Sequence, residues 1–89
     1  MAAIALPAVL TMSEARATLA QLQPALQADP APVFDASGLQ SLDTAALAVL
    51  LECQRLAVAS GKRLQVVAAP ARLGQLAQLY GVEALLGLA

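Results

Sequence analysis

Apolar positions change their spacing along the first third of the chain. Residues 3–10 are almost continuously apolar, which predicts a short extended segment, and Pro7 inside it is compatible only with a sheet edge or an irregularity. Thr11 and Glu14 then have the spacing of a capping box, and apolar residues follow at helical intervals. We therefore predict a helix to about residue 27, which Pro24 either kinks or ends early.

The rest of the chain alternates between strand and helix patterns. A brief strand is predicted at residues 33–34, ending in a turn at 35–38. A helix, a strand, a helix and a final short turn follow over residues 43–60, 63–69, 70–81 and 82–88. This alternation predicts a single domain over residues 1–89 with an α/β fold, in which helices pack on a small mixed β-sheet. The strands on either side of helix 43–60 should run parallel.

Helix 43–60 carries apolar residues on two opposite sides. One side is a stripe suited to packing on the sheet, formed by Ala46, Val49, Leu50, Cys53, Ala57 and Ser60. The other side is formed by Thr44, Leu47, Ala48, Leu51 and Arg55. Two interpretations remain open for this second side: a partner-binding surface, or leucines that neighbouring helices cover within the domain.

Composition narrows the classes of function. The chain is 60% hydrophobic, only 12% charged and has a net charge of −1, so it lacks the basic footprint of a nucleic-acid-binding protein. It has no histidine and a single cysteine, Cys53, which we interpret as a small buried hydrophobe. With this inventory we expect no enzyme, no metal site and no cofactor.

Neither a signal peptide nor a membrane span is expected. No positive charge precedes the apolar N-terminal run, Pro7 interrupts it, and the longest later run, residues 45–51, is far shorter than the roughly 20 residues that cross a bilayer. We therefore expect a chain that is soluble in the cytoplasm, or held at a membrane only by a partner.

The Asp43-Thr44 pair has two interpretations. Both residue types are preferred at helix N-termini, so either residue can simply cap the helix. Alternatively, Thr44 presents a hydroxyl for phosphorylation, and the added negative charge would oppose an apolar interface around Leu47 and Leu51 without unfolding the domain.

The segment "VFDASGLQSLDTAALAVLLECQRLAVASGKRLQVV" and the ending "LAQLYGVEALL" resemble a STAS domain. That family includes anti-sigma factor antagonists and the MlaB-like small subunits of bacterial phospholipid-transport ABC complexes, and the ending resembles the MlaB-like branch. The resemblance is good over about residues 33–86 and poor before them.

The resemblance implies a docking function for the second apolar side. It places Thr44 at the position that a kinase phosphorylates in the antagonists, and it implies contact with a cytoplasmic ATPase in MlaB-like proteins. We expect partner binding through Asp43, Thr44, Leu47, Ala48, Leu51 and Arg55, with Arg55 and Glu52 as a polar rim. Whether isolated chains form a homodimer through the same patch is left open.

Two departures limit what the resemblance implies, and the second favours a constitutive subunit over a switch. Ala46 stands where the family usually has glycine, and "LPAVLTMSEA" replaces the Gly-Glu-Leu-Asp segment of the kinase-regulated antagonists. The expected function is thus an accessory subunit that supports the ATPase of an Mla-type complex at the inner membrane, which maintains outer-membrane lipid asymmetry. The alternative is an anti-sigma factor antagonist whose partner is an anti-sigma kinase.

Overall fold

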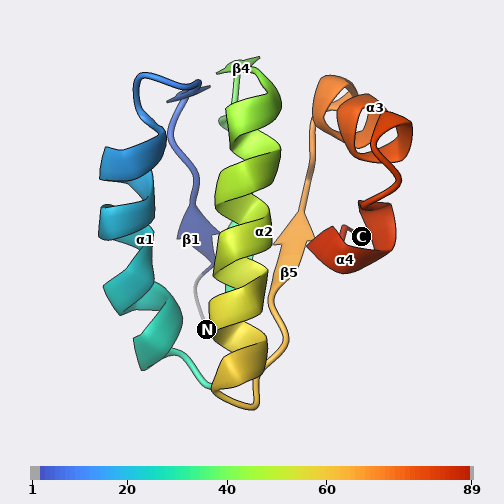
Figure 1. The fold of residues 1–89 in the computed structure, drawn as a ribbon. Coiled ribbons are helices and arrows are strands. Elements are labelled where there is room, and N and C mark those ends of the chain that lie inside the picture. The colour runs from blue at the N-terminus through green and yellow to red at the C-terminus, as the bar shows by residue number, and fades with distance from the viewer. Residues whose placement is uncertain (1–2, 89) are drawn as a thin grey trace.

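The computed structural model describes residues 3–88, which form five short strands and four helices (Figure 1). In chain order the elements are β1 (Ile4–Ala5), β2 (Val9–Leu10), α1 (Ala15–Ala28), β3 (Val33–Asp35), β4 (Ser41–Leu42), α2 (Thr44–Ala59), β5 (Gln65–Val67), α3 (Ala71–Leu79) and α4 (Glu83–Leu86).

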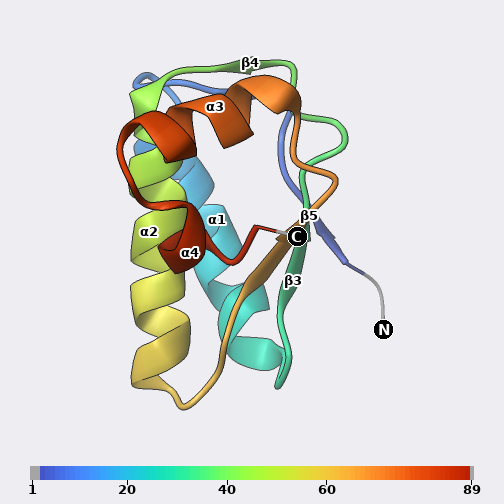
Figure 2. The ribbon, with the colours of Figure 1, turned by 90° about the vertical axis from the view of Figure 1, so that its right-hand side faces the viewer.

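The strands form two small parallel sheets. The larger has the order β1-β3-β5, with Phe34 opposite both Ile4 and Val66, and the smaller pairs β2 with β4. Helices α1, α2 and α4 lie on one side of the larger sheet, and α3 lies across its upper end (Figure 2). The predicted α/β fold is confirmed, and every strand pair within residues 3–88 is parallel, where we expected a mixed sheet.

The N-terminal third differs from the sequence prediction at three points. The extended segment is divided at Pro7 into β1 and β2, as an irregularity there would require. Helix α1 begins only at Ala15, because residues 11–14 form a turn in which the Glu14 N–H donates to the Thr11 carbonyl. Pro24 does not end the helix, which continues to Ala28; Pro24 and Ala20 are exposed, so water can reach the carbonyl that the proline leaves without a donor.

Helix α2 has clear start and stop signals. The Asp43 carboxylate accepts a hydrogen bond from the Ala45 N–H at 2.8 Å and is therefore the N-cap. At the other end Gly61 has φ +74°, and the Lys62 N–H donates back to the Ala57 carbonyl at 2.8 Å, which closes the helix in a left-handed C-terminal turn. The Lys62 ammonium donates to the carbonyls of Leu26 and Gln27, so it stabilises the C-terminus of α1 rather than that of α2.

The hydrophobic core lies between the sheets and the helices. The predicted sheet-facing stripe of α2 is buried from Ala46 to Ala57, whereas Ser60 is exposed at the helix end. The stripe packs with leucines from all the other helices and with the strand residues Phe34 and Val66. Among residues 3–88, no helix has both the length and the apolar character that crossing a bilayer requires.

Among residues 3–88, one non-glycine residue adopts a left-handed backbone conformation. Ala68, which follows β5, has φ +57°. A side chain in this region costs about 1–2 kcal/mol relative to the right-handed region. The cost is local strain at the connection from β5 to α3.

Substituting Ala68→Gly should therefore stabilise the protein. We expect the free energy of unfolding to rise by about 0.5 kcal/mol, because the greater chain entropy of glycine when unfolded offsets part of the relieved strain. Ala20→Gly, at an exposed site inside α1, is the control and should lower it by about 0.5–1 kcal/mol. Urea denaturation of both variants measures the two changes, and a loss of stability in Ala68→Gly would contradict the strain.

Candidate partner-binding surface

The outer side of α2 is a ridge with a groove on each flank. The deeper groove separates α2 from α3 and α4 and consists of two hollows of about 430 and 280 Å³ that share Leu51. The first hollow is lined by Thr44, Leu47, Ala48, Leu51, Tyr80 and Val82, and the second by Leu51, Gln54, Arg55, Val58 and Leu85. A shallower hollow of about 260 Å³ lies toward α1 and also includes Ala48. We call the groove between α2 and α3–α4, with its two hollows, the C-terminal groove.

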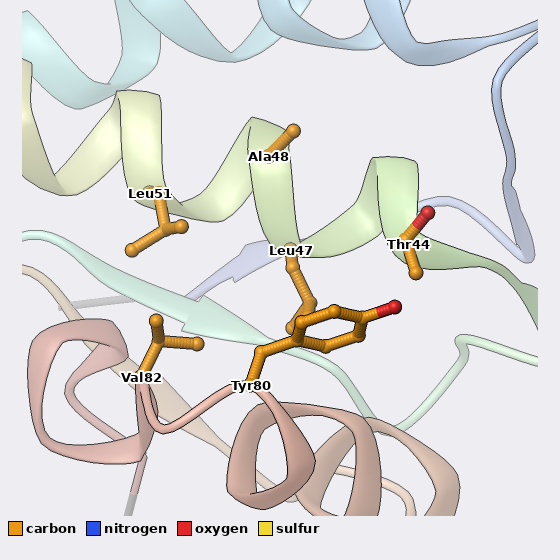
Figure 3. A pocket seen from close by; sticks show the side chains of 6 residues that line it. All are labelled: Thr44, Leu47, Ala48, Leu51, Tyr80 and Val82. Carbon is orange, nitrogen blue, oxygen red and sulfur yellow. The ribbon is translucent and has the colours of Figure 1, made fainter.

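The groove brings together five of the six predicted site residues. Thr44, Leu47, Ala48, Leu51 and Arg55 all line it, whereas Asp43 does not. In the first hollow Leu47 points toward the ring of Tyr80 and Leu51 points toward Val82 (Figure 3). The predicted second side of α2 is therefore a real surface feature, and its partner-binding role stays a prediction.

The burial of Leu47 bears on the two interpretations of this side of α2. Leu47 is only 5% exposed and belongs to the core cluster, so this leucine is covered within the domain. It also lines the first hollow, and we call it the floor of that hollow. Leu51 is half-buried, and Ala48 and Arg55 are exposed. The accessible part of the ridge is therefore narrower than the apolar side of α2 that the helical spacing predicted.

Three lining residues from the C-terminal region were missed in the sequence. Tyr80, Val82 and Leu85 form the far wall of the groove, and Tyr80 and Leu85 are 58% and 60% exposed. The Tyr80 side chain, from the end of α3, lines the first hollow (Figure 3). The available signal was composition: Tyr80 is the single tyrosine of a chain with only 2% aromatic residues.

Asp43 and Thr44 have separate roles at the start of α2. The two Asp43 carboxylate oxygens accept hydrogen bonds from the backbone N–H groups of Ala45, at 2.8 Å, and of Met12, at 3.2 Å. Asp43 thus caps α2 and ties it to the turn before α1. Thr44 is not the cap, and its exposed side chain lies at the end of the first hollow.

An ion pair forms the charged rim of the second hollow. The Arg55 guanidinium donates two hydrogen bonds to the Glu52 carboxylate, at 2.8 and 2.7 Å. These bonds lower the pKa of Glu52 and raise the pKa of Arg55, so both groups stay charged at neutral pH. The rim therefore adds two opposite charges and no net field beside an apolar groove.

Cys53 lies beneath the ridge and takes no part in the groove. Its side chain is fully buried, and this burial, with a smaller contribution from the charge of Glu52, raises the pKa of the thiol from 9.0 to about 11. Within residues 3–88, no three His, Cys, Asp or Glu side chains lie together as a metal site would require. The expectation of a buried, hydrophobe-like Cys53 is confirmed.

Alanine substitutions at the floor of the groove and at its accessible edge should lower the free energy of unfolding by different amounts. Leu47→Ala should lower the free energy of unfolding by about 2–5 kcal/mol, because it opens a cavity in the core. Leu51→Ala should lower it less, by about 1–2 kcal/mol, since that side chain is partly exposed and packs only at the edge of the core. Chemical denaturation measures both, and equal losses would mean that Leu51 is as deeply packed as Leu47.

The raised pKa of Cys53 predicts a pH dependence of stability. Below pH 9.0 the thiol is protonated in both the folded and the unfolded chain, so the full stability is present; as the pH rises toward about 11, only the unfolded chain loses the proton, and stability falls. We expect wild type to lose stability relative to Cys53→Ala across this interval, measured by urea denaturation at a series of pH values. A constant difference between the two proteins would show that the thiol has an ordinary pKa.

Comparison with known proteins places the chain in one protein family. A comparison with curated proteins found no match. A family model described as "Mlab, STAS domain" matches residues 2–87, which includes the N-terminal third where the resemblance of the sequence was poor. Since this match spans nearly the whole chain, the chain belongs to the MlaB-type STAS domain family.

Proposed function

We propose that this protein is a non-enzymatic accessory subunit that docks on the cytoplasmic ATPase of a bacterial phospholipid-transport ABC complex of the Mla type. In this role it supports the ATPase and contributes to outer-membrane lipid asymmetry. It resides in the cytoplasm and reaches the inner membrane only through the ATPase. The observation that carries the proposal is the apolar C-terminal groove, with two hollows that share Leu51, in a chain of the MlaB-type family.

The composition of the groove supports protein binding. Interfaces concentrate energy in a few aromatic and aliphatic anchors inside a polar rim. Here the exposed Tyr80 and the half-buried Leu51 supply anchor surface, and the Glu52–Arg55 pair lies at the edge. Because that pair is already neutralised internally, the apolar contacts rather than net charge would provide most of the affinity.

Thr44 supports a second candidate, an anti-sigma factor antagonist regulated by phosphorylation. The residue is exposed at the first position of α2, where the positive end of the helix dipole favours an anion. A phosphate there would add nearly two negative charges at the end of an apolar hollow. In this alternative an anti-sigma kinase, rather than an ATPase, occupies the groove.

Leu51→Glu should abolish partner recovery while leaving the fold intact. The introduced carboxylate would be buried without a partner on docking, whereas in the free chain it can reach water from a half-buried position. The measurement is a pull-down from native cells with tagged wild type and variant, together with circular dichroism of each. We expect wild type to recover an ABC ATPase and Leu51→Glu to lose it at least about tenfold, as a lost anchor requires.

Two further variants complete the experiment. Ala20→Glu places the same charge on an exposed site of α1 outside the groove and should leave ATPase recovery unchanged. If wild type instead recovers a small kinase that Thr44→Glu releases, the antagonist function replaces the proposal. Undiminished ATPase recovery by Leu51→Glu would show that docking uses another surface.

A further inference from the structure

The outer edge of β5 is closed by a side chain from α2. Gln54 is buried, and its amide nitrogen donates to the Leu64 carbonyl at 2.9 Å while its amide oxygen accepts from the Leu64 N–H at 2.9 Å. A neighbouring strand would make the same pair of bonds. The amide therefore replaces one residue of a missing strand at the start of β5.

The C-terminal segment continues this closure one step further along β5. The Val66 N–H donates to the Gly87 carbonyl at 3.0 Å, and Leu88 forms a parallel bridge with Val66. Gly87 also fits directly against the Gln54 amide: a Cβ at this position would lie 2.4 Å from the Leu64 carbonyl oxygen and 3.2 Å from the Gln54 nitrogen. Gln54, Leu64 and Gly87 thus meet at one point, which we call the clasp.

The clasp lies beside the wall of the C-terminal groove. Leu85 stands two residues before Gly87 and faces Gln54 across the second hollow, which both residues line. The four-residue helix α4 is too short to hold its own position by helix formation. Its place against α2 therefore depends on tertiary contacts. The Val66–Gly87 hydrogen bond supplies a polar contact to β5, and the Gln54 amide in the clasp lies directly against Gly87.

We propose that Gln54 is a positioning residue for the docking surface: by joining α2, β5 and Gly87 it fixes α4, and with it Leu85, at the width that a partner requires. Gln54 acts through Leu85 and need not contact the partner. This inference rests on the proposed function for its binding consequence, whereas the positioning itself is a property of the free chain.

Amide hydrogen exchange of the free protein, followed by NMR, tests the positioning. Gln54→Met keeps the side-chain size but removes both hydrogen bonds, so the Leu64 amide should exchange at least about tenfold faster. If Gln54 holds α4, the amides of Val66 and of residues 85–88 should accelerate as well. Gln75→Met, at an exposed site of α3, is the matched control and should change none of these rates. Acceleration of Leu64 alone would overturn the proposal, because Gln54 would then only complete the sheet edge.

Gln54→Glu gives an independent test should Gln54→Met fail to fold. A protonated carboxyl can both donate to the Leu64 carbonyl and accept from its N–H, whereas the ionised form can only accept. Exchange protection of Val66 and residues 85–88, corrected for intrinsic rates, should therefore be native-like at acidic pH and should fall as the introduced carboxyl ionises. Protection with the same pH dependence as wild type would contradict the clasp.

Affinity for the purified ABC ATPase separates a positioning role from general stability. Gln54→Met should weaken binding about tenfold in the wild-type background and have little further effect in Leu85→Ala, since both changes remove the same contact. Independent, multiplicative losses would show that Gln54 does not act through Leu85. If wild type binds no ATPase, the proposed function fails, while the exchange experiments still decide whether the clasp positions α4.

Discussion

The packing of α2 against three neighbours at once is the constraint on which the rest of the structure depends. One side of the helix covers the β1-β3-β5 sheet, and its two flanks meet α1 and the α3–α4 region (Figures 1 and 2). A helix enclosed in this way needs apolar residues around most of its circumference. This explains why its first turns are apolar on every side, and why only a narrow ridge with Ala48, Leu51 and Arg55 is left for contacts outside the domain.

The same constraint assigns separate tasks to adjacent residues at the N-terminus of α2. Both carboxylate oxygens of Asp43 accept hydrogen bonds from backbone N–H groups, one in its own helix and one in the turn before α1. Asp43 therefore fixes the position of the whole ridge, whereas Thr44 remains accessible beside the first hollow. A motif of two polar residues thus combines a structural cap with a free hydroxyl, and only the second is available to a partner or a kinase.

The spacing of apolar residues, together with capping and turn residues, predicted the elements that are long or have clear start and stop signals. The α/β order, the parallel strands around α2, a cap at Asp43 or Thr44 and a helix end near residue 60 all follow from sequence pattern and general rules of chain connection. Strand β4 was missed because two residues carry no periodicity, and the path of α1 through Pro24 depends on the exposure of that turn. Exposure is a tertiary property that local sequence does not encode.

The candidate site was predicted on one wall only, for a related reason. Helical spacing placed Thr44, Leu47, Ala48 and Leu51 on one side of α2, but it contains no information on what lies opposite. The far wall comes from Tyr80, Val82 and Leu85, roughly thirty residues later, and it is this wall that turns a helix face into a groove. Such long-range pairing depends on the path of α3 and α4 over the end of the sheet.

The most direct test of the docking surface is methyl NMR of the chain, labelled at leucine and valine, during titration with the purified ABC ATPase. The account predicts that the methyl signals of Leu51, Val58, Val82 and Leu85 shift or broaden first, whereas those of Leu22 and Leu26, which are buried in α1, stay unchanged. Changes confined to Val9 and Leu19, on the opposite flank of the molecule, or no changes at all, would contradict docking through the C-terminal groove.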